Sequence, residues 1–170
     1  MMKVKVFCLG ALVVIMGAVA QATAQESNQQ TLSLTTSGWQ TACNAVNRKT
    51  ALECRVEASA ILTESGQRLT DFTIRVPEAK AQPLLMVRVP LEVSLSVGIT
   101  MKVDEGKPFS YSLQTCNTSG CYFGNPLDKD LLAAMIKGKQ LILTMQDTSQ
   151  NDISLTLPLN GFAEAFALVK

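Results

Sequence analysis

Residues 91–103 read Leu-Glu-Val-Ser-Leu-Ser-Val-Gly-Ile-Thr-Met-Lys-Val, and an apolar side chain occupies every second position from Leu91 to Val103. Side chains of a β-strand alternate between its two faces, so this period of two predicts a half-buried strand. Thirteen extended residues would span about 43 Å, which is long for a small sheet. We expect a bulge, bend or turn at Gly98 to break the run. Pro90 cannot donate to a ladder and therefore separates this run from a strand at 85–89.

Shorter segments of the same character lie on both sides of this run. Turn-forming residues separate them, for example Ser65-Gly66 and Ser149-Gln150-Asn151-Asp152. A chain of roughly eight short strands with frequent turns is typical of a mostly β sandwich or barrel. The further strands are predicted at 39–43, 52–61, 69–76, 109–116, 141–145 and 153–159.

Two short helices are predicted among these strands. Asp128 is a good N-cap for the first helix, which ends at Gly138 and carries its apolar stripe at helical spacing. Lys137 and Lys139 flank Gly138 and suit the negative end of the helix dipole. The second helix begins at Phe162. The apolar residues expected on one side of these helices are Leu131, Leu132, Met135 and Ile136 in the first, and Phe162, Phe166 and Val169 in the second.

The N-terminus has the three parts of a secretory signal peptide. Lys3 and Lys5 precede an almost wholly apolar stretch at 6–20, and Ala22-Thr23-Ala24 offers small residues for cleavage. The apolar stretch has about 15 residues and a bilayer needs roughly 20, so cleavage is favoured over a membrane anchor. We therefore expect export, with a signal peptide at 1–24, a flexible polar segment at 25–37 and one domain at 38–170. No later segment is apolar over a length that could span a membrane.

Four cysteines follow the expected cleavage site: Cys43, Cys54, Cys116 and Cys121. An even count in an exported chain predicts disulfides, and sequence proximity favours Cys43–Cys54 and Cys116–Cys121 among the three possible connectivities. The alternative is a four-thiolate zinc site. Zinc ligands usually come in pairs about two to four residues apart, which the first pair does not match, and the chain has no histidine. We therefore predict disulfides, and neither a metal nor a cofactor.

Composition argues against catalysis and against nucleic-acid binding. Without histidine the usual catalytic triads are excluded. The fourteen acidic residues would allow a two-carboxylate hydrolase, but those at 104–105, 128 and 130 fall at turn and cap positions, where a structural role is sufficient. Residues 25–170 contain thirteen basic and fourteen acidic side chains, so no basic excess favours a polyanion. We predict that the chain is not an enzyme.

Aromatic and basic residues near the cysteines are the remaining candidates for a site. Trp39 is the only tryptophan and is expected to pack in the core beside a disulfide rather than to stack on a ligand. Tyr122 and Phe123 are expected either in the core or at its rim, and the core is favoured. Arg48 and Lys49 lie between the first two cysteines, where a solvated hairpin tip is favoured over a contact with an anionic surface.

Four motifs occur in order along the expected mature chain. They are Gly38–Cys43, with Trp39 four residues before the cysteine; the proline-led stretch 89–104; Tyr111–Cys121, with its Cys-x4-Cys pair; and the ending 157–166, Leu-Pro-Leu-Asn-Gly-Phe-Ala-Glu-Ala-Phe. This ordered set resembles the invasion-associated locus B family of bacterial envelope proteins.

The resemblance implies an immunoglobulin-like antiparallel β-sandwich, a periplasmic or surface location, and a link to host-cell invasion in some pathogens. It implies no known chemistry. Glu92 departs from the pattern, because members often carry glycine after Pro-Leu, and this leaves the local turn open. We therefore predict an exported, non-enzymatic binding protein whose partner is a protein in the envelope or at a host surface. The alternative is a structural or chaperone-like envelope stress protein.

Overall fold

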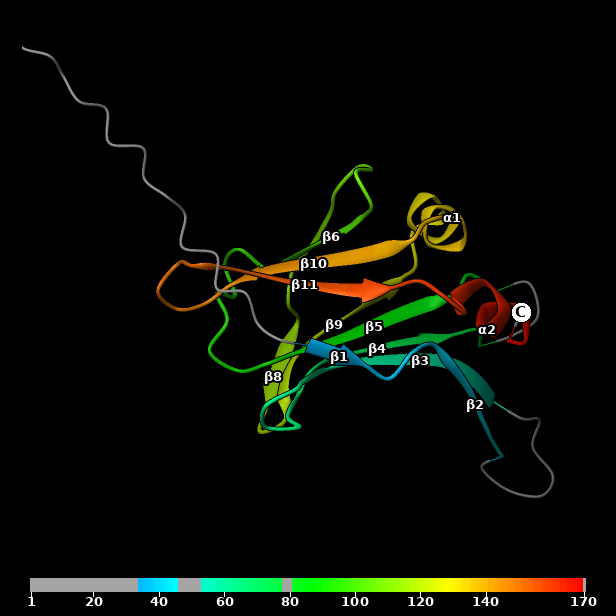
Figure 1. The fold of residues 1–170 in the computed structure, drawn as a ribbon, viewed down its shortest axis with the longest axis horizontal. Coiled ribbons are helices and arrows are strands. Elements are labelled where there is room, and N and C mark those ends of the chain that lie inside the picture. The colour runs from blue at the N-terminus through cyan, green and yellow to red at the C-terminus, as the bar shows by residue number, and fades with distance from the viewer. Residues whose placement is uncertain (1–33, 46–52, 78–80, 170) are drawn as a thin grey trace, which may run out of the picture.

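Two antiparallel β-sheets pack face to face, with two short helices at one end (Figure 1). The structure is a computed structural model and describes residues 34–45, 53–77 and 81–169. The larger sheet has the order β1-β3-β4-β5-β9-β8, with β2 also on β3, and the smaller has the order β11-β10-β6-β7. The mostly β sandwich predicted from the sequence is confirmed.

The elements have the following bounds. The larger sheet contains β1 (Leu34–Thr36), β2 (Gln40–Asn44), β3 (Glu53–Leu62), β4 (Arg68–Arg75), β5 (Leu84–Val89), β8 (Thr115–Asn117) and β9 (Gly120–Pro126). The smaller sheet contains β6 (Ile99–Val103), β7 (Phe109–Tyr111), β10 (Gln140–Gln146) and β11 (Asp152–Pro158). The helices are α1 (Lys129–Lys137) and α2 (Phe162–Ala167).

β1 and β2 follow one another along the same edge of the larger sheet. β1 pairs with the end of β3 and β2 with its beginning, and Gly38, with φ of +72°, lies in the connection between them. β1 lies inside the segment 25–37 that was predicted to be flexible, so the sheet begins earlier than expected. The reason is that Leu34 packs against the core while its backbone pairs with Leu62.

Trp39 is buried, as predicted, where the N-terminal edge meets the C-terminal helix. Its ring lies edge-on to Phe162, with centroids 4.8 Å apart, and its Nε1 donates to the carbonyl oxygen of Pro158 at 2.9 Å. The Thr41 hydroxyl donates to the carbonyl oxygen of Ala165 at 2.9 Å. These contacts join the first strands of the domain to its last helix.

Tyr122 and Phe123 lie on opposite faces of β9. Phe123 is in the core and contacts Tyr111, with ring centroids 4.3 Å apart, whereas Tyr122 is half-buried on the outer face. The favoured core position is therefore correct for Phe123 but wrong for Tyr122, because consecutive strand residues point to opposite sides. Burial raises the pKa of the Tyr111 hydroxyl above its ordinary value, and the charge of Asp128 raises it further.

The predicted strand at 109–116 is two strands in different sheets. The chain leaves the smaller sheet after β7 and joins the larger sheet at β8. At the crossing, the side-chain amide of Gln114 takes the place of a strand partner for Gly124. Its Oε1 accepts from the backbone N–H of Gly124, and its Nε2 donates to the Gly124 carbonyl oxygen, both at 3.1 Å. Periodicity cannot show such a change of sheet, since both halves are extended.

α1 begins as predicted, because the Asp128 carboxylate accepts from the backbone N–H groups of Asp130 and Leu131. Gly138 ends the helix for a different reason from the one expected. Its φ of −81° is ordinary, but a Cβ there would lie 2.2 Å from Cγ1 of Val103, so glycine allows the helix end to approach β6. The stripe is also narrower than predicted, because Leu131 and Met135 are buried while Ile136 is exposed.

Both disulfides join neighbouring strands. Cys43–Cys54 links β2 to β3, and Cys116–Cys121 links β8 to β9, with Cα atoms 4.0 Å apart in each pair. These are the pairs that sequence proximity favours. Arg48, Lys49 and the expected signal peptide lie outside the described residues. Among the helices that the structure describes, none has the length and apolarity needed to cross a membrane.

Candidate interaction surface

Residues 90–98 connect the two sheets and form a loop. Glu92 has φ of +65° and Gly98 has φ of +73°, so the backbone enters the left-handed region near each end of the loop. The predicted strand at 91–103 is therefore correct only for Ile99–Val103. Gly98 marks the break as expected, but the residues before it do not continue the ladder because the chain must pass from β5 in one sheet to β6 in the other.

Three apolar side chains of this loop are exposed to solvent. The exposed fractions are 48% for Leu91, 55% for Leu95 and 56% for Val97, whereas Val93 is 7% exposed and belongs to the core. We call Leu91, Leu95 and Val97 the apolar loop patch. Single exposed apolar residues are normal; we take these three as a candidate contact surface because they lie within seven residues of one loop.

Backbone hydrogen bonds fix this loop against the turn between β10 and β11. Val93 forms a β-bridge with Asp147, the N–H of Ser94 donates to Gln146 at 2.8 Å, and the N–H of Thr148 donates to Glu92 at 3.2 Å. Within the loop, the N–H of Gly98 donates to the carbonyl oxygen of Ser94 at 3.1 Å. The patch is therefore presented by a fixed backbone, which lowers the entropy cost of binding.

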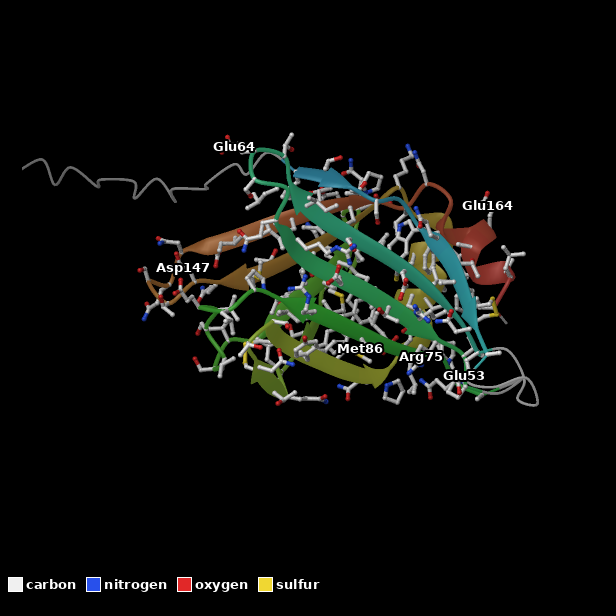
Figure 2. The ribbon with its side chains drawn as sticks, turned by 90° about the horizontal axis from the view of Figure 1, so that it is seen from below. Glu53, Glu64, Arg75, Met86, Asp147 and Glu164 are labelled. Atoms are coloured by element: carbon white, nitrogen blue, oxygen red, sulfur yellow. A yellow bond between two sulfur atoms is a disulfide. The ribbon has the colours of Figure 1, made fainter. Side chains whose placement is uncertain are left out.

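Asp147 in turn holds the β10–β11 turn. Its carboxylate accepts from the backbone N–H groups of Ser149 at 2.8 Å and Asn151 at 2.9 Å, and from the Asn151 side-chain amide at 2.9 Å. The hydrogen bond from the Asn151 side chain is the main cause that lowers the pKa of Asp147. Figure 2 shows Asp147 at the end of the molecule opposite Glu164 of α2, so the turn and the patch lie away from the meeting point of the terminal segments.

Gly98 is required by a close approach as well as by its conformation. A Cβ at this position would lie 2.3 Å from the carbonyl oxygen of Tyr111 on β7. Real side chains do not approach a backbone oxygen so closely. The end of the loop is therefore pressed against the edge of the smaller sheet.

A shallow hollow of about 370 Å³ lies beside the patch and is lined by Gln67, Arg68, Arg88, Pro90, Leu91, Glu92, Thr118 and Ser119. Arg88 is used internally, because its Nε donates to Asp71 at 2.6 Å and its Nη1 donates to the Ser119 carbonyl oxygen at 2.9 Å. Asp71 also accepts from the Ser59 hydroxyl at 2.6 Å. Arg88 therefore braces β4, β5 and the β8–β9 turn rather than offering a free cation to a ligand.

The outer face of the larger sheet, which Figure 2 views directly, is the other broad surface. Its charges are largely paired. Arg75 with Glu53 at 3.3 Å and Arg88 with Asp71 at 2.6 Å are pairs between neighbouring strands, and Arg55 with Glu57 is a pair within β3. Met86 lies on this face beside these pairs and is exposed (Figure 2). Because its charges compensate one another, this face offers less specific attraction than the loop patch.

The residues singled out from the sequence lie mostly away from the loop. Val89, the last residue of β5, is opposite Cys121, so the second disulfide lies beside the start of the loop. The first disulfide joins β2 to the beginning of β3, and Trp39 contacts Phe162 of α2. Sequence reasoning missed the patch because its apolar residues were assigned to a buried strand face. Among the described residues, no group of three or more Cys, Asp or Glu is placed to hold a metal ion.

Comparison with known proteins identifies the family to which the chain belongs. The family model described as "Invasion associated locus B (IalB) protein" matches residues 39–170. The chain belongs to the invasion associated locus B family. Invasion protein B homologues from two strains of Brucella abortus, strain 2308 and biovar 1 strain 9-941, are each 26% identical over 137 residues, covering 79% of this chain and 77% of each relative.

A solved member also shares the architecture. The crystal structure of invasion associated protein b from Bartonella henselae matches with a TM-score of 0.66 and 23% identity, over 77% of this chain and 89% of that chain. At this identity the likeness supports the fold. The two disulfides of this IalB chain fit a location outside the cytoplasm, since disulfides persist in oxidising compartments.

Proposed function

We propose that this IalB chain is an exported, non-enzymatic binding protein of the periplasm or cell surface, and that it contacts a protein partner through the apolar loop patch. The observation that carries the proposal is the exposure of Leu91, Leu95 and Val97 on a loop whose backbone is fixed by hydrogen bonds. The signal-peptide pattern and the disulfides support export. The names of the relatives support a contribution to host-cell invasion.

The size of the patch sets the kind of interface. Fully burying a Leu or Val side chain is worth about 1.5–3 kcal/mol, so covering three half-exposed side chains contributes roughly 3 kcal/mol. Association costs at least about 4 kcal/mol in lost translational and rotational freedom. The patch therefore cannot bind alone, and the partner must also contact its surroundings, which include the turn at 147–151 that is hydrogen-bonded to the loop.

Site-specific photocrosslinking in living cells tests the proposal. A benzoylphenylalanine at position 95 should give a covalent adduct with an envelope or host-surface protein, and excess wild-type protein should suppress the adduct. The matched control is the same group at position 168, where Leu168 is 72% exposed near the C-terminus at the helix end of the fold. The doubly substituted competitor Leu95→Ser/Val97→Ser should fail to suppress the adduct. Equal crosslinking from positions 95 and 168 would contradict the proposal.

Export is tested by sequencing the N-terminus of the protein recovered from the envelope fraction. We expect it to begin at Gln25. Recovery of the protein from the cytoplasm with Lys3 and Lys5 retained would contradict export.

A chaperone-like role is a second candidate, which one observation favours. Among the described residues, β11 pairs along its length with β10 and has no strand partner on its other side, where the Trp39 indole donates to the Pro158 carbonyl oxygen at one end. An unpaired edge of this length can accept a strand from another chain. If this role is correct, an equimolar amount of the protein should suppress the heat-induced aggregation of citrate synthase, measured by light scattering without a reductant. Unchanged scattering would exclude it.

A further inference from the structure

We propose that the apolar loop patch binds a protein segment in which apolar residues alternate with lysine or arginine. This inference rests on the proposed function and adds the chemistry of the partner. It follows from the charges that surround the patch, which the loop and the neighbouring turn supply.

Carboxylates are the only charged groups of these two segments. Residues 90–98 and 146–152 contain Glu92, Asp147 and Asp152 and no lysine or arginine. Asp152 accepts from the Gln146 side-chain amide at 2.9 Å, and Asp147 accepts the three hydrogen bonds of the turn. Hydrogen bonds to a carboxylate favour its ionised form, and those from Asn151 and Ser149 lower the pKa of Asp147, so this group keeps its negative charge at neutral pH.

Two arginines line the hollow beside the patch, and they do not reverse this charge. Arg88 is bound to Asp71, and Arg68 lies 3.6 Å from the same carboxylate. Counting Glu92, Asp147, Asp152 and Asp71 against the two arginines leaves a net charge of −2. The patch is therefore an apolar surface with an acidic border.

The negative charge around the patch discriminates between three possible binding partners. An anionic membrane surface would be repelled by the carboxylates. A second copy of the chain, meeting through the same surface, would place like charges opposite one another. A segment that carries both apolar and basic side chains satisfies the patch and its border together, and it supplies the further contacts that the patch needs.

Peptide titration followed by NMR tests the inference on the protein purified from the envelope. The probe is a peptide of about nine residues in which lysine and leucine alternate, which matches the length of a strand. We expect it to shift the backbone amide signals of 91–98 and 146–152 in a saturable manner. Raising the salt from about 0.1 M to about 1 M shortens the Debye length from about 10 Å to about 3 Å and should weaken binding at least about tenfold.

Two variants separate the apolar and the electrostatic contributions. Leu95→Ser/Val97→Ser should abolish binding, whereas Glu92→Gln/Asp152→Asn should weaken it about tenfold and remove most of its dependence on salt. Asp147 is left intact because it holds the turn. Thermal unfolding of each variant checks that the fold is retained.

Control peptides and vesicles test whether binding requires the basic side chains of the lysine–leucine peptide. A glutamate–leucine or serine–leucine peptide that binds as tightly as the lysine–leucine peptide would overturn the inference, as would saturable binding of phosphatidylglycerol vesicles through residues 91–98. The absence of any shift with the lysine–leucine peptide would also overturn it. In each case a crosslink from position 95 would still support the proposed function, so the two failures are distinguishable.

Discussion

Replacing Glu92 by glycine should stabilise the protein. Glu92 has φ of +65°, and the left-handed conformation costs an L-residue about 1–2 kcal/mol. Glycine relieves this cost but gains about 0.5–1 kcal/mol of conformational entropy in the unfolded chain. The carbonyl oxygen of Glu92 keeps its hydrogen bond from Thr148, since only the side chain changes. The expected net gain in the free energy of unfolding is about 0.5–1 kcal/mol.

Thermal unfolding followed by circular dichroism measures this gain. A change of that size raises the Tm of a domain with this length by about 2–5 °C. Glu92→Ala is the matched control, because it removes the same carboxylate but retains the Cβ that causes the strain. We expect no comparable gain from alanine. If the glycine variant is no more stable than the alanine variant, the backbone at position 92 is not strained and the account of this turn is incorrect.

Four further predictions concern the surroundings of the loop and the core. Gly98→Ala should lower the stability by about 2–3 kcal/mol in urea unfolding, because its Cβ would meet the carbonyl oxygen of Tyr111; an unchanged midpoint would refute the close approach. Trp39→Phe keeps the ring contact but removes the hydrogen bond to Pro158, which should cost about 1 kcal/mol by the same assay. Because the pKa of Asp147 is lowered in the folded state, its contribution to stability is complete above the ordinary aspartate range and is lost only as the pH falls through its lower folded pKa. Its carboxyl carbon signal in NMR should therefore titrate at a lower pH than that of an unstructured aspartate. Replacing both cysteines of either disulfide by serine should cost roughly 2–3 kcal/mol, and thiol titration of the intact denatured protein recovered from the envelope should find no free cysteine.

Strands with uninterrupted alternation and a helix with a clear N-cap residue were predictable from the sequence. The strand predicted at 141–145 lies in β10, and that at 153–159 corresponds closely to β11; the two pair along their full length. Asp128 located the start of α1 because the N-cap hydrogen bond is local and depends on one side chain. The pairing of cysteines that sequence proximity favours is also the one in the structure.

The candidate surface was not predictable, for a physical reason. Alternation shows that two faces of a segment differ, but not that either face is covered. Leu91, Leu95 and Val97 satisfy the strand pattern as well as Ile99 and Met101 do. The difference lies in the positive φ angles at 92 and 98 and in the partner strands, neither of which periodicity reports.

The contacts of Trp39 and Thr41 with the C-terminal segment have a consequence for the order of folding. Their hydrogen-bond partners lie 119 and 124 residues further along the chain. A ribosome or a secretion channel delivers the N-terminal strand long before those partners emerge. Phe72 of β4 can contact the indole early, but the hydrogen bonds to Pro158 and Ala165 can form only after nearly the whole polypeptide has been released.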